Sequence, residues 1–119
     1  MQRNLWRLHA AVLALVWALV LATATAGTVA AQQAASVAIS VKDHRFQPAE
    51  IHAPANTPLT IRVKNLDSAP MEFESVSLRV EKVVAGGGEG VVNVRALAPG
   101  RYEFFDDFHQ QTRGTLVVQ

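Results

Sequence analysis

The sequence contains no cysteine among its 119 residues. This absence excludes disulfide bonds, a thiolate nucleophile and any metal site that requires a thiolate ligand. An excess of charge is also absent, because 11 Lys and Arg residues stand against 10 Asp and Glu residues. Without a basic patch, nothing in the sequence indicates a nucleic-acid-binding protein. The only strongly apolar run, residues 10–22, has about 13 residues, fewer than the roughly 20 that span a bilayer.

The first 31 residues have the order of a secretory signal peptide. Arg3 and Arg7 precede the apolar run, and small residues follow it as far as Ala31, where we expect cleavage. An uncleaved membrane anchor is the alternative, since no charged side chain lies between His9 and Lys42. Cleavage leaves residues 32–119 as one small domain, with 9 basic and 10 acidic residues and a net charge of −1. We therefore expect a periplasmic protein.

The remaining sequence predicts strands and no helices. Residues 35–42 and 59–64 alternate apolar and polar side chains with a period of two, which is typical of strands with one buried face. Shorter strands are expected at 50–53, 71–75, 78–84, 91–94, 101–105 and 114–118, and a turn at 43–48. Seven or eight short strands separated by turns predict an all-β fold, an antiparallel Greek-key β-sandwich.

Tyr102 gives a more specific indication of this fold. It follows the Pro99-Gly100 turn and enters a strand, as does the tyrosine of a tyrosine corner in Greek-key sandwiches. The glycines at 86–90 lack the Lys-Ser/Thr pair and the helix of a phosphate-binding loop. No Ser-His-Asp order or zinc motif favours a hydrolase.

Acidic residues and one histidine gather near the end of the chain. Asp106, Asp107 and His109 lie within four residues at the end of an aromatic strand, a pattern that predicts a metal site. The two acids can instead shape a turn, and adjacent side chains at a strand end diverge, so only one of them is expected to reach a metal. We favour Asp107. His44 is interpreted as a loop residue and His52 as a residue on the polar face of a strand, with a part in metal binding as the alternative for each.

A second acidic pair precedes this group. Glu72 and Glu74 are two residues apart on an expected strand and therefore share one face. They form either part of the metal site or a solvated acidic face. Clustered carboxylates repel unless a cation lies between them. That cation is either a metal ion or a side chain such as Arg101, Arg113 or Lys82, and the sequence does not choose between them.

The order of elements resembles that of a cupredoxin, the blue-copper sandwich. In that family an asparagine-led loop precedes the first histidine ligand, and Cys, His and Met follow near the end. Here Asn65 begins the matching loop and Met71 stands where the first histidine would be. Asp106 falls at the cysteine position and His109 at the second histidine, while the axial methionine has no counterpart in the shortened segment 110–113.

One blue-copper ligand of four is therefore retained, which excludes a His₂Cys copper centre and its blue colour. The donors that remain are carboxylates, one imidazole and one thioether: Met71, Glu72, Glu74, Asp106, Asp107 and His109. Carboxylate with imidazole suits divalent copper, iron, manganese or zinc, and a thioether adds affinity for cuprous copper.

A narrower resemblance rests on two motifs. Glu72–Phe73–Glu74–Ser75 with Leu78 and Glu81-Lys82, and the segment 104–109 (FFDDFH), are similar to small periplasmic cupredoxin-like proteins found with bacterial iron permeases. This resemblance implies copper or iron as the metal, an inner-membrane iron permease and a second periplasmic metal-binding protein as partners, and a part in ferrous iron oxidation or delivery. An acid often precedes the Glu-Phe-Glu run in those proteins. Met71 replaces it here, which leaves the identity of the metal open.

Three functions are consistent with these residues. The first is a metal-binding protein of iron uptake, in which His109 and nearby acids bind copper or iron. The second is a metal-free module that docks a permease or another partner through the same loops. The third is a copper carrier in which Met71 and His109 hold cuprous ion.

Overall fold

The computed structural model describes residues 26–27 and 34–119. The expected signal peptide lies almost wholly outside these residues. Residues 34–119 lie within one compact unit. Its strands are β1 (Ala35–Lys42), β2 (Arg45–Gln47), β3 (Glu50–Ala53), β4 (Leu59–Asn65), β5 (Met71–Ser75), β6 (Val80–Val84), β7 (Glu89–Val94), β8 (Gly100–Asp106) and β9 (His109–Val118). Within the described residues, no helix is long and apolar enough to cross a membrane.

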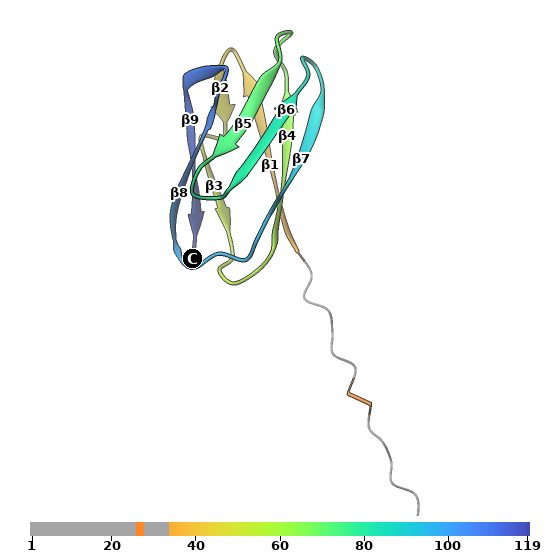
Figure 1. Ribbon diagram of the computed structural model, residues 1–119, viewed down its shortest axis with the longest axis vertical. Helices are drawn as coiled ribbons and strands as arrows, with labels where there is room; N and C mark the ends of the chain where they lie inside the picture. Colours follow the sequence, from red (N-terminus) through yellow and green to blue (C-terminus); the bar gives the residue numbers. More distant parts are fainter. Residues whose placement is uncertain (1–25, 28–33) are drawn as a thin grey trace, which may run out of the picture. The chain divides into compact units, whose positions relative to one another are not determined.

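The strands form two sheets that pack face to face, with strand orders β2-β1-β4-β7 and β3-β9-β8-β5-β6 (Figure 1). This arrangement confirms the predicted all-β sandwich. Most neighbouring strands are antiparallel, but β1 pairs with β4 and β3 with β9 in parallel. Both sheets are therefore mixed, because the chain crosses between the sheets before it returns beside an earlier strand.

The core lies between the inward-facing side chains of the two sheets. Alternation along β4 buries Leu59, Ile61 and Val63, as the period of two predicts. Near one end, Phe104 contacts Phe46 edge-on and stacks on Phe73, with ring centroids 4.9 and 5.1 Å away. Aromatic contacts of this kind hold the two sheets together where the candidate site lies.

Two segments differ from the expectation. The expected turn at 43–48 contains strand β2, because the buried side chain of Phe46 anchors it to the core. The last strand begins at His109, and the expected loop is reduced to the two residues between Asp106 and His109. The first half of β9 is not predicted as a strand, because the adjacent polar residues Gln110 and Gln111 interrupt the alternation of apolar and polar side chains.

The tyrosine corner is confirmed. The Tyr102 hydroxyl donates a hydrogen bond to the carbonyl oxygen of Ala98, at 2.8 Å. This bond fixes the entry of β8 into the sheet. The β8–β9 hairpin then lies at the opposite end of the sandwich from the C-terminus, beside the β1–β2 turn (Figure 1).

Candidate metal site

Backbone hydrogen bonds bring the two predicted segments together. The Glu72 amide donates to Oδ1 of Asp106 at 2.9 Å, and the Asp107 amide donates to the Glu72 carbonyl oxygen at 2.9 Å. The candidate donors nevertheless divide between two faces of the sheet. Met71 and Asp106 face the core, whereas Glu72 and Glu74 lie on the outer face, because successive side chains on a strand alternate.

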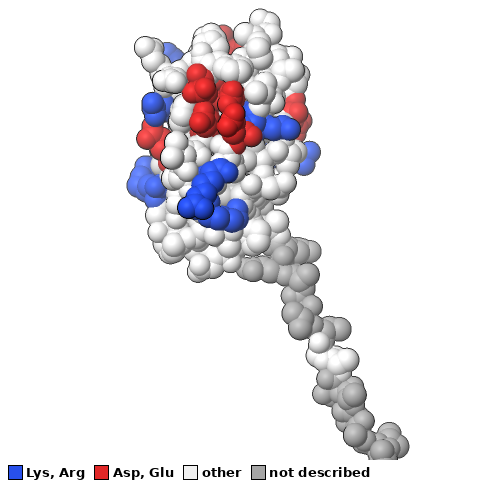
Figure 2. Space-filling view, in the orientation of Figure 1, with Lys and Arg blue, Asp and Glu red and all other residues white. Residues whose placement is uncertain are grey.

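The outer face carries a carboxylate group formed by Glu72, Glu74 and Asp107. Oxygen atoms of these three residues lie within 4.8 Å of one another. Figure 2 shows acidic side chains gathered on one face of the molecule, above a basic patch. Asp107, and not Asp106, joins the glutamates. That Asp107 contacts a metal stays a prediction. Carboxylates this close can share one divalent cation.

The same proximity alters the pKa of both glutamates. A hydrogen bond shared with the Glu81 carboxyl, with burial and the charges of Glu81, Asp107 and Glu74, raises the pKa of Glu72 to about 7. Burial, followed by the charges of Asp107 and Glu81, raises the pKa of Glu74. Raised pKa values are expected where carboxylates face one another without a cation.

The basic side chains considered from the sequence do not neutralise this group. Arg101 pairs with Glu50, with Nη2 and Oε2 3.1 Å apart, and Arg113 pairs with Glu103. Across residues 34–119, no Lys or Arg forms an ion pair with Glu72, Glu74 or Asp107. Of the two alternatives left open by the sequence, the ion-pair network is therefore not what the structure contains.

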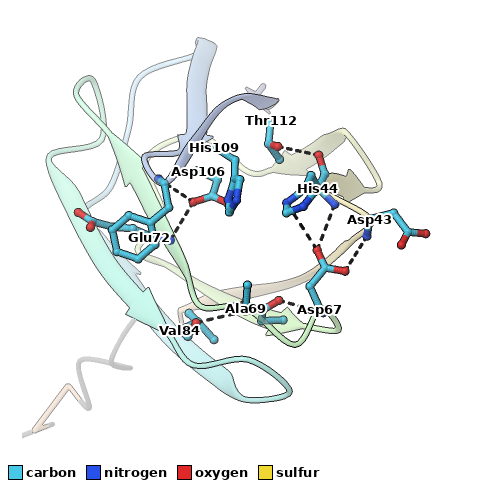
Figure 3. A network of polar contacts seen from close by, with 11 residues as sticks. Asp43, His44, Asp67, Ala69, Glu72, Val84, Asp106, His109 and Thr112 are labelled. Carbon is cyan, nitrogen blue, oxygen red and sulfur yellow. Dashed lines mark hydrogen bonds and ion pairs between the residues drawn. The ribbon is translucent and has the colours of Figure 1, made fainter.

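Asp106 is fully buried and already committed to protein partners. Its Oδ1 accepts hydrogen bonds from the amides of Glu72 and Phe108, at 2.9 and 3.0 Å. Its Oδ2 lies 3.0 Å from Nδ1 of His109 (Figure 3). When Asp106 is ionised and His109 neutral, the carboxylate accepts from Nδ1–H and the lone pair of the imidazole lies on Nε2. The geometry thus assigns Asp106 the orientation of His109 rather than direct contact with a metal.

His44 is a residue that the sequence interpretation placed in a loop and did not include in the site. Its ring lies against that of His109, with centroids 4.1 Å apart and an angle of 38° between the ring planes. The only local signal was its position at a tight turn. The contact depends on how β1–β2 and β8–β9 meet, which the sequence pattern does not show.

Met71 is 2% exposed and belongs to the hydrophobic core. Its thioether is therefore on the opposite side of β5 from the carboxylate group. Asn65, at the start of the preceding loop, is also buried, and its side-chain amide donates to the carbonyl oxygens of Ala69 and Val84 at 2.8 and 3.3 Å. These bonds fix the loop that leads to Met71.

Comparison with known proteins identifies the family. A family model described as a cupredoxin-like domain matches residues 11–118. This chain belongs to the cupredoxin-like domain family. The cupredoxin-like chain is also 39% identical over 83 residues to the uncharacterized protein RP394 of Rickettsia prowazekii (strain Madrid E), a match that covers 69% of this chain and 66% of that protein. The chain thus spans just under two thirds of the length of this relative.

Solved structures show the same fold. The metal-binding domain of the Cu(I)-exporting P-type ATPase CopA from Streptococcus pneumoniae D39, with Cu(I), aligns with a TM-score of 0.62 and 17% identity, covering 71% of this chain and 84% of that chain. Auracyanin A, a "blue" copper protein from Chloroflexus aurantiacus, aligns with a TM-score of 0.61 and 16% identity, covering 73% of this chain and 100% of auracyanin A. At these identities the likeness shows the fold alone.

The donor set of this cupredoxin-like domain does not fit a blue-copper centre. The described residues contain no cysteine. Asp106 occupies the position at which the resemblance places the cysteine ligand, and its carboxylate already accepts hydrogen bonds from two amides and lies close to His109. The structure offers the imidazole of His109 and, separately, the carboxylate group; imidazole and carboxylate oxygen both suit divalent copper or iron.

Proposed function

We propose that this protein is a periplasmic cupredoxin-like metal-binding protein that holds copper, iron or both. In this proposal it assists the oxidation or delivery of ferrous iron in a high-affinity uptake system. Its partners are an inner-membrane iron permease and a second periplasmic metal-binding protein. The observation that carries the proposal is the carboxylate group of Glu72, Glu74 and Asp107, whose oxygens converge within 4.8 Å without an ion-paired Lys or Arg in the described domain.

The carboxylate group suits ferrous iron as the substrate. Three oxygen donors from two elements offer a hard cation several ligands, one from the buried Glu72 and two from the half-buried Glu74 and Asp107. Because the pKa of Glu72 is about 7, a bound cation has to displace a proton near neutral pH. The raised pKa of both glutamates indicates repulsion between the carboxylates, which a bound cation would relieve.

His109 supplies the donor for copper. Its Nδ1 lies against Asp106, and its side chain is 36% exposed, so Nε2 of the neutral ring can bind a metal ion that arrives from solvent. Oxidised copper, when bound, supplies an acceptor for the single electron that ferrous iron loses on becoming ferric. The protein's own contribution is to orient the imidazole on β9 and to gather the carboxylates of β5 and Asp107, with β8 between the two strands.

The test is metal binding by the demetallated protein. We expect calorimetry to show tight binding of one Cu²⁺ per chain, which is lost in His109→Ala. Under anaerobic conditions we expect binding of Fe²⁺ to the carboxylate group, which is lost in Glu74→Gln and kept in His109→Ala. Glu89→Gln is the matched control, because Glu89 is exposed and pairs with Arg62 away from the carboxylate group. Absence of affinity for both ions would overturn the proposal.

A second experiment separates this function from a metal-free docking module. Cells that depend on this protein for iron uptake would be complemented with wild type or His109→Ala. The metal-binding proposal predicts uptake only with the wild type. Equal uptake with both proteins would show that docking alone suffices.

A further inference from the structure

We propose that His44 and His109 act as one imidazole pair that binds Cu²⁺ at the end of the sandwich where the β1–β2 turn meets the β8–β9 hairpin. The inference rests on the proposed function, because it assumes that the protein binds copper. It adds a ligand, His44, that lies outside the carboxylate group and outside the positions at which blue-copper proteins carry their ligands.

The backbone of His44 is held in an unusual conformation. Asp43 and His44 form the two-residue turn between β1 and β2, and both have positive φ, at 50° and 56°. The second position of such a turn is usually glycine, because a side chain there is strained. Strain of this kind is kept only where surrounding contacts impose it, and it often marks a functional residue.

Contacts from two other elements impose this conformation. The carboxylate of Asp67, in the β4–β5 loop, accepts hydrogen bonds from the backbone amides of Asp43 and His44, at 2.7 and 3.1 Å (Figure 3). The buried hydroxyl of Thr112, on β9, donates to the carbonyl oxygen of His44 at 2.6 Å. The backbone of His44 is thus fixed on both sides, although its side chain is 55% exposed.

The two rings are close enough to share one ion. Two imidazole nitrogens bound to the same metal at about 2.0–2.1 Å are roughly 3.3 Å apart in a tetrahedral site. Because each ring centroid lies about 1.1 Å beyond its nitrogen, two rings bound to one metal in this geometry have centroids about 5 Å apart. The rings, now 4.1 Å apart, must therefore separate by about 1 Å, a movement that the exposed side chain of His44 permits. His109 presents Nε2, because Asp106 holds its Nδ1.

Charge and access at this end also favour a cation. The carboxylates of Asp67 and Asp106 lie behind the two rings, with Oδ2 of Asp67 4.0 Å from Nδ1 of His44. The rings line an open groove with Arg45 and the polar residues of β9, so solvent reaches them. Cu²⁺ is the divalent ion that imidazole sites bind most strongly, and water can complete its coordination.

The experiment compares Cu²⁺ binding by wild type, His44→Asn and His109→Asn. Asparagine tolerates positive φ, so His44→Asn removes the imidazole and keeps the turn. We expect each substitution to lower Cu²⁺ affinity at least tenfold in a chelator competition. The control is His52→Asn, since His52 is equally exposed on β3 and pairs with Glu50; its affinity should equal that of wild type.

A second measurement needs no variant. Pulsed electron paramagnetic resonance of the wild-type protein with one Cu²⁺ should show couplings to the nitrogens of two histidine rings. Coupling to one ring, or wild-type affinity in His44→Asn together with loss of affinity in His109→Asn, would overturn the pair and leave the proposed function standing. Failure of the wild type to bind Cu²⁺ and Fe²⁺ would overturn both.

Discussion

At the residue scale, the carboxylate of Asp106 connects three parts of the chain. It accepts hydrogen bonds from the backbone amides of Glu72 on β5 and Phe108 in the hairpin, and it lies close to the ring of His109 on β9. The position that carries a thiolate in the resembling blue-copper proteins is thus used here to organise hydrogen bonds. A buried carboxylate is tolerated because each of its oxygens has a partner.

This arrangement predicts the effect of Asp106→Asn. Asparagine has one acceptor oxygen and an NH₂ group, so either a backbone amide or the Nδ1–H of His109 loses its acceptor. We expect the free energy of unfolding, measured with urea, to fall by about 1–3 kcal/mol. Asp43→Asn is the control, because the Asp43 side chain is exposed and asparagine accepts its positive φ. Equal stability of the two variants would contradict the role given to Asp106.

At the element scale, Gly114 on β9 lies opposite Phe104 on β8, whose ring packs over the glycine. A Cβ atom there would lie 2.3 Å from Cε2 of Phe104 and 3.0 Å from the carbonyl oxygen of Ala49. Gly114→Ala must therefore displace the core aromatic ring, and we expect a loss of about 1–3 kcal/mol in the free energy of unfolding. Gly100→Ala, where the nearest atom of Tyr102 would be 3.5 Å away, should change stability little. Similar losses in both variants would argue against this packing.

The pairing of β5 with β6 predicts how stability depends on pH. Glu81 on β6 faces the glutamates of β5, and the pKa of Glu72 is raised from 4.5 to about 7. The folded state therefore holds a proton that the unfolded chain releases, so this group makes the free energy of unfolding rise as pH falls from about 7 to 4.5. The lowered pKa of Asp67 acts in the opposite sense and only below 3.8.

Glu81→Gln removes the largest cause of the raised pKa of Glu72. In metal-free buffer we expect the gain in unfolding free energy between pH 8 and pH 5 to be smaller in Glu81→Gln than in wild type. Glu89→Gln, which lies outside the group, should keep the wild-type gain. The idea fails if Glu81→Gln and wild type respond to pH alike.

At the scale of the whole molecule, we expect a signal peptidase to cleave the N-terminal segment from the sandwich. We predict that expression in a Gram-negative bacterium yields a periplasmic protein whose mass corresponds to residues 32–119, because the apolar run is short for a bilayer. Intact mass spectrometry of the periplasmic fraction tests this. Recovery of the full-length chain from the membrane fraction would favour the uncleaved anchor instead.

Much of the fold could be predicted from local patterns. The alternation in β1 and β4 located two central strands, and Tyr102 indicated the corner that the hydrogen bond to Ala98 confirms. Strand β2 and the first half of β9 were not found, because their burial rests on single side chains, Phe46 and Thr112, within polar surroundings. A single buried side chain does not produce the alternation of apolar and polar residues by which a strand is predicted from sequence.

The sequence by itself determined that no thiolate site exists, that the domain is all-β, and which acids and histidines are available as donors. Only the tertiary structure decided that Glu72 and Glu74 meet Asp107 on the outer face, that Asp106 is held in the interior, and that His44 reaches His109. The physical reason is that composition and period are local properties. Which donors converge depends on strand register and on the meeting of turns that are distant in the chain.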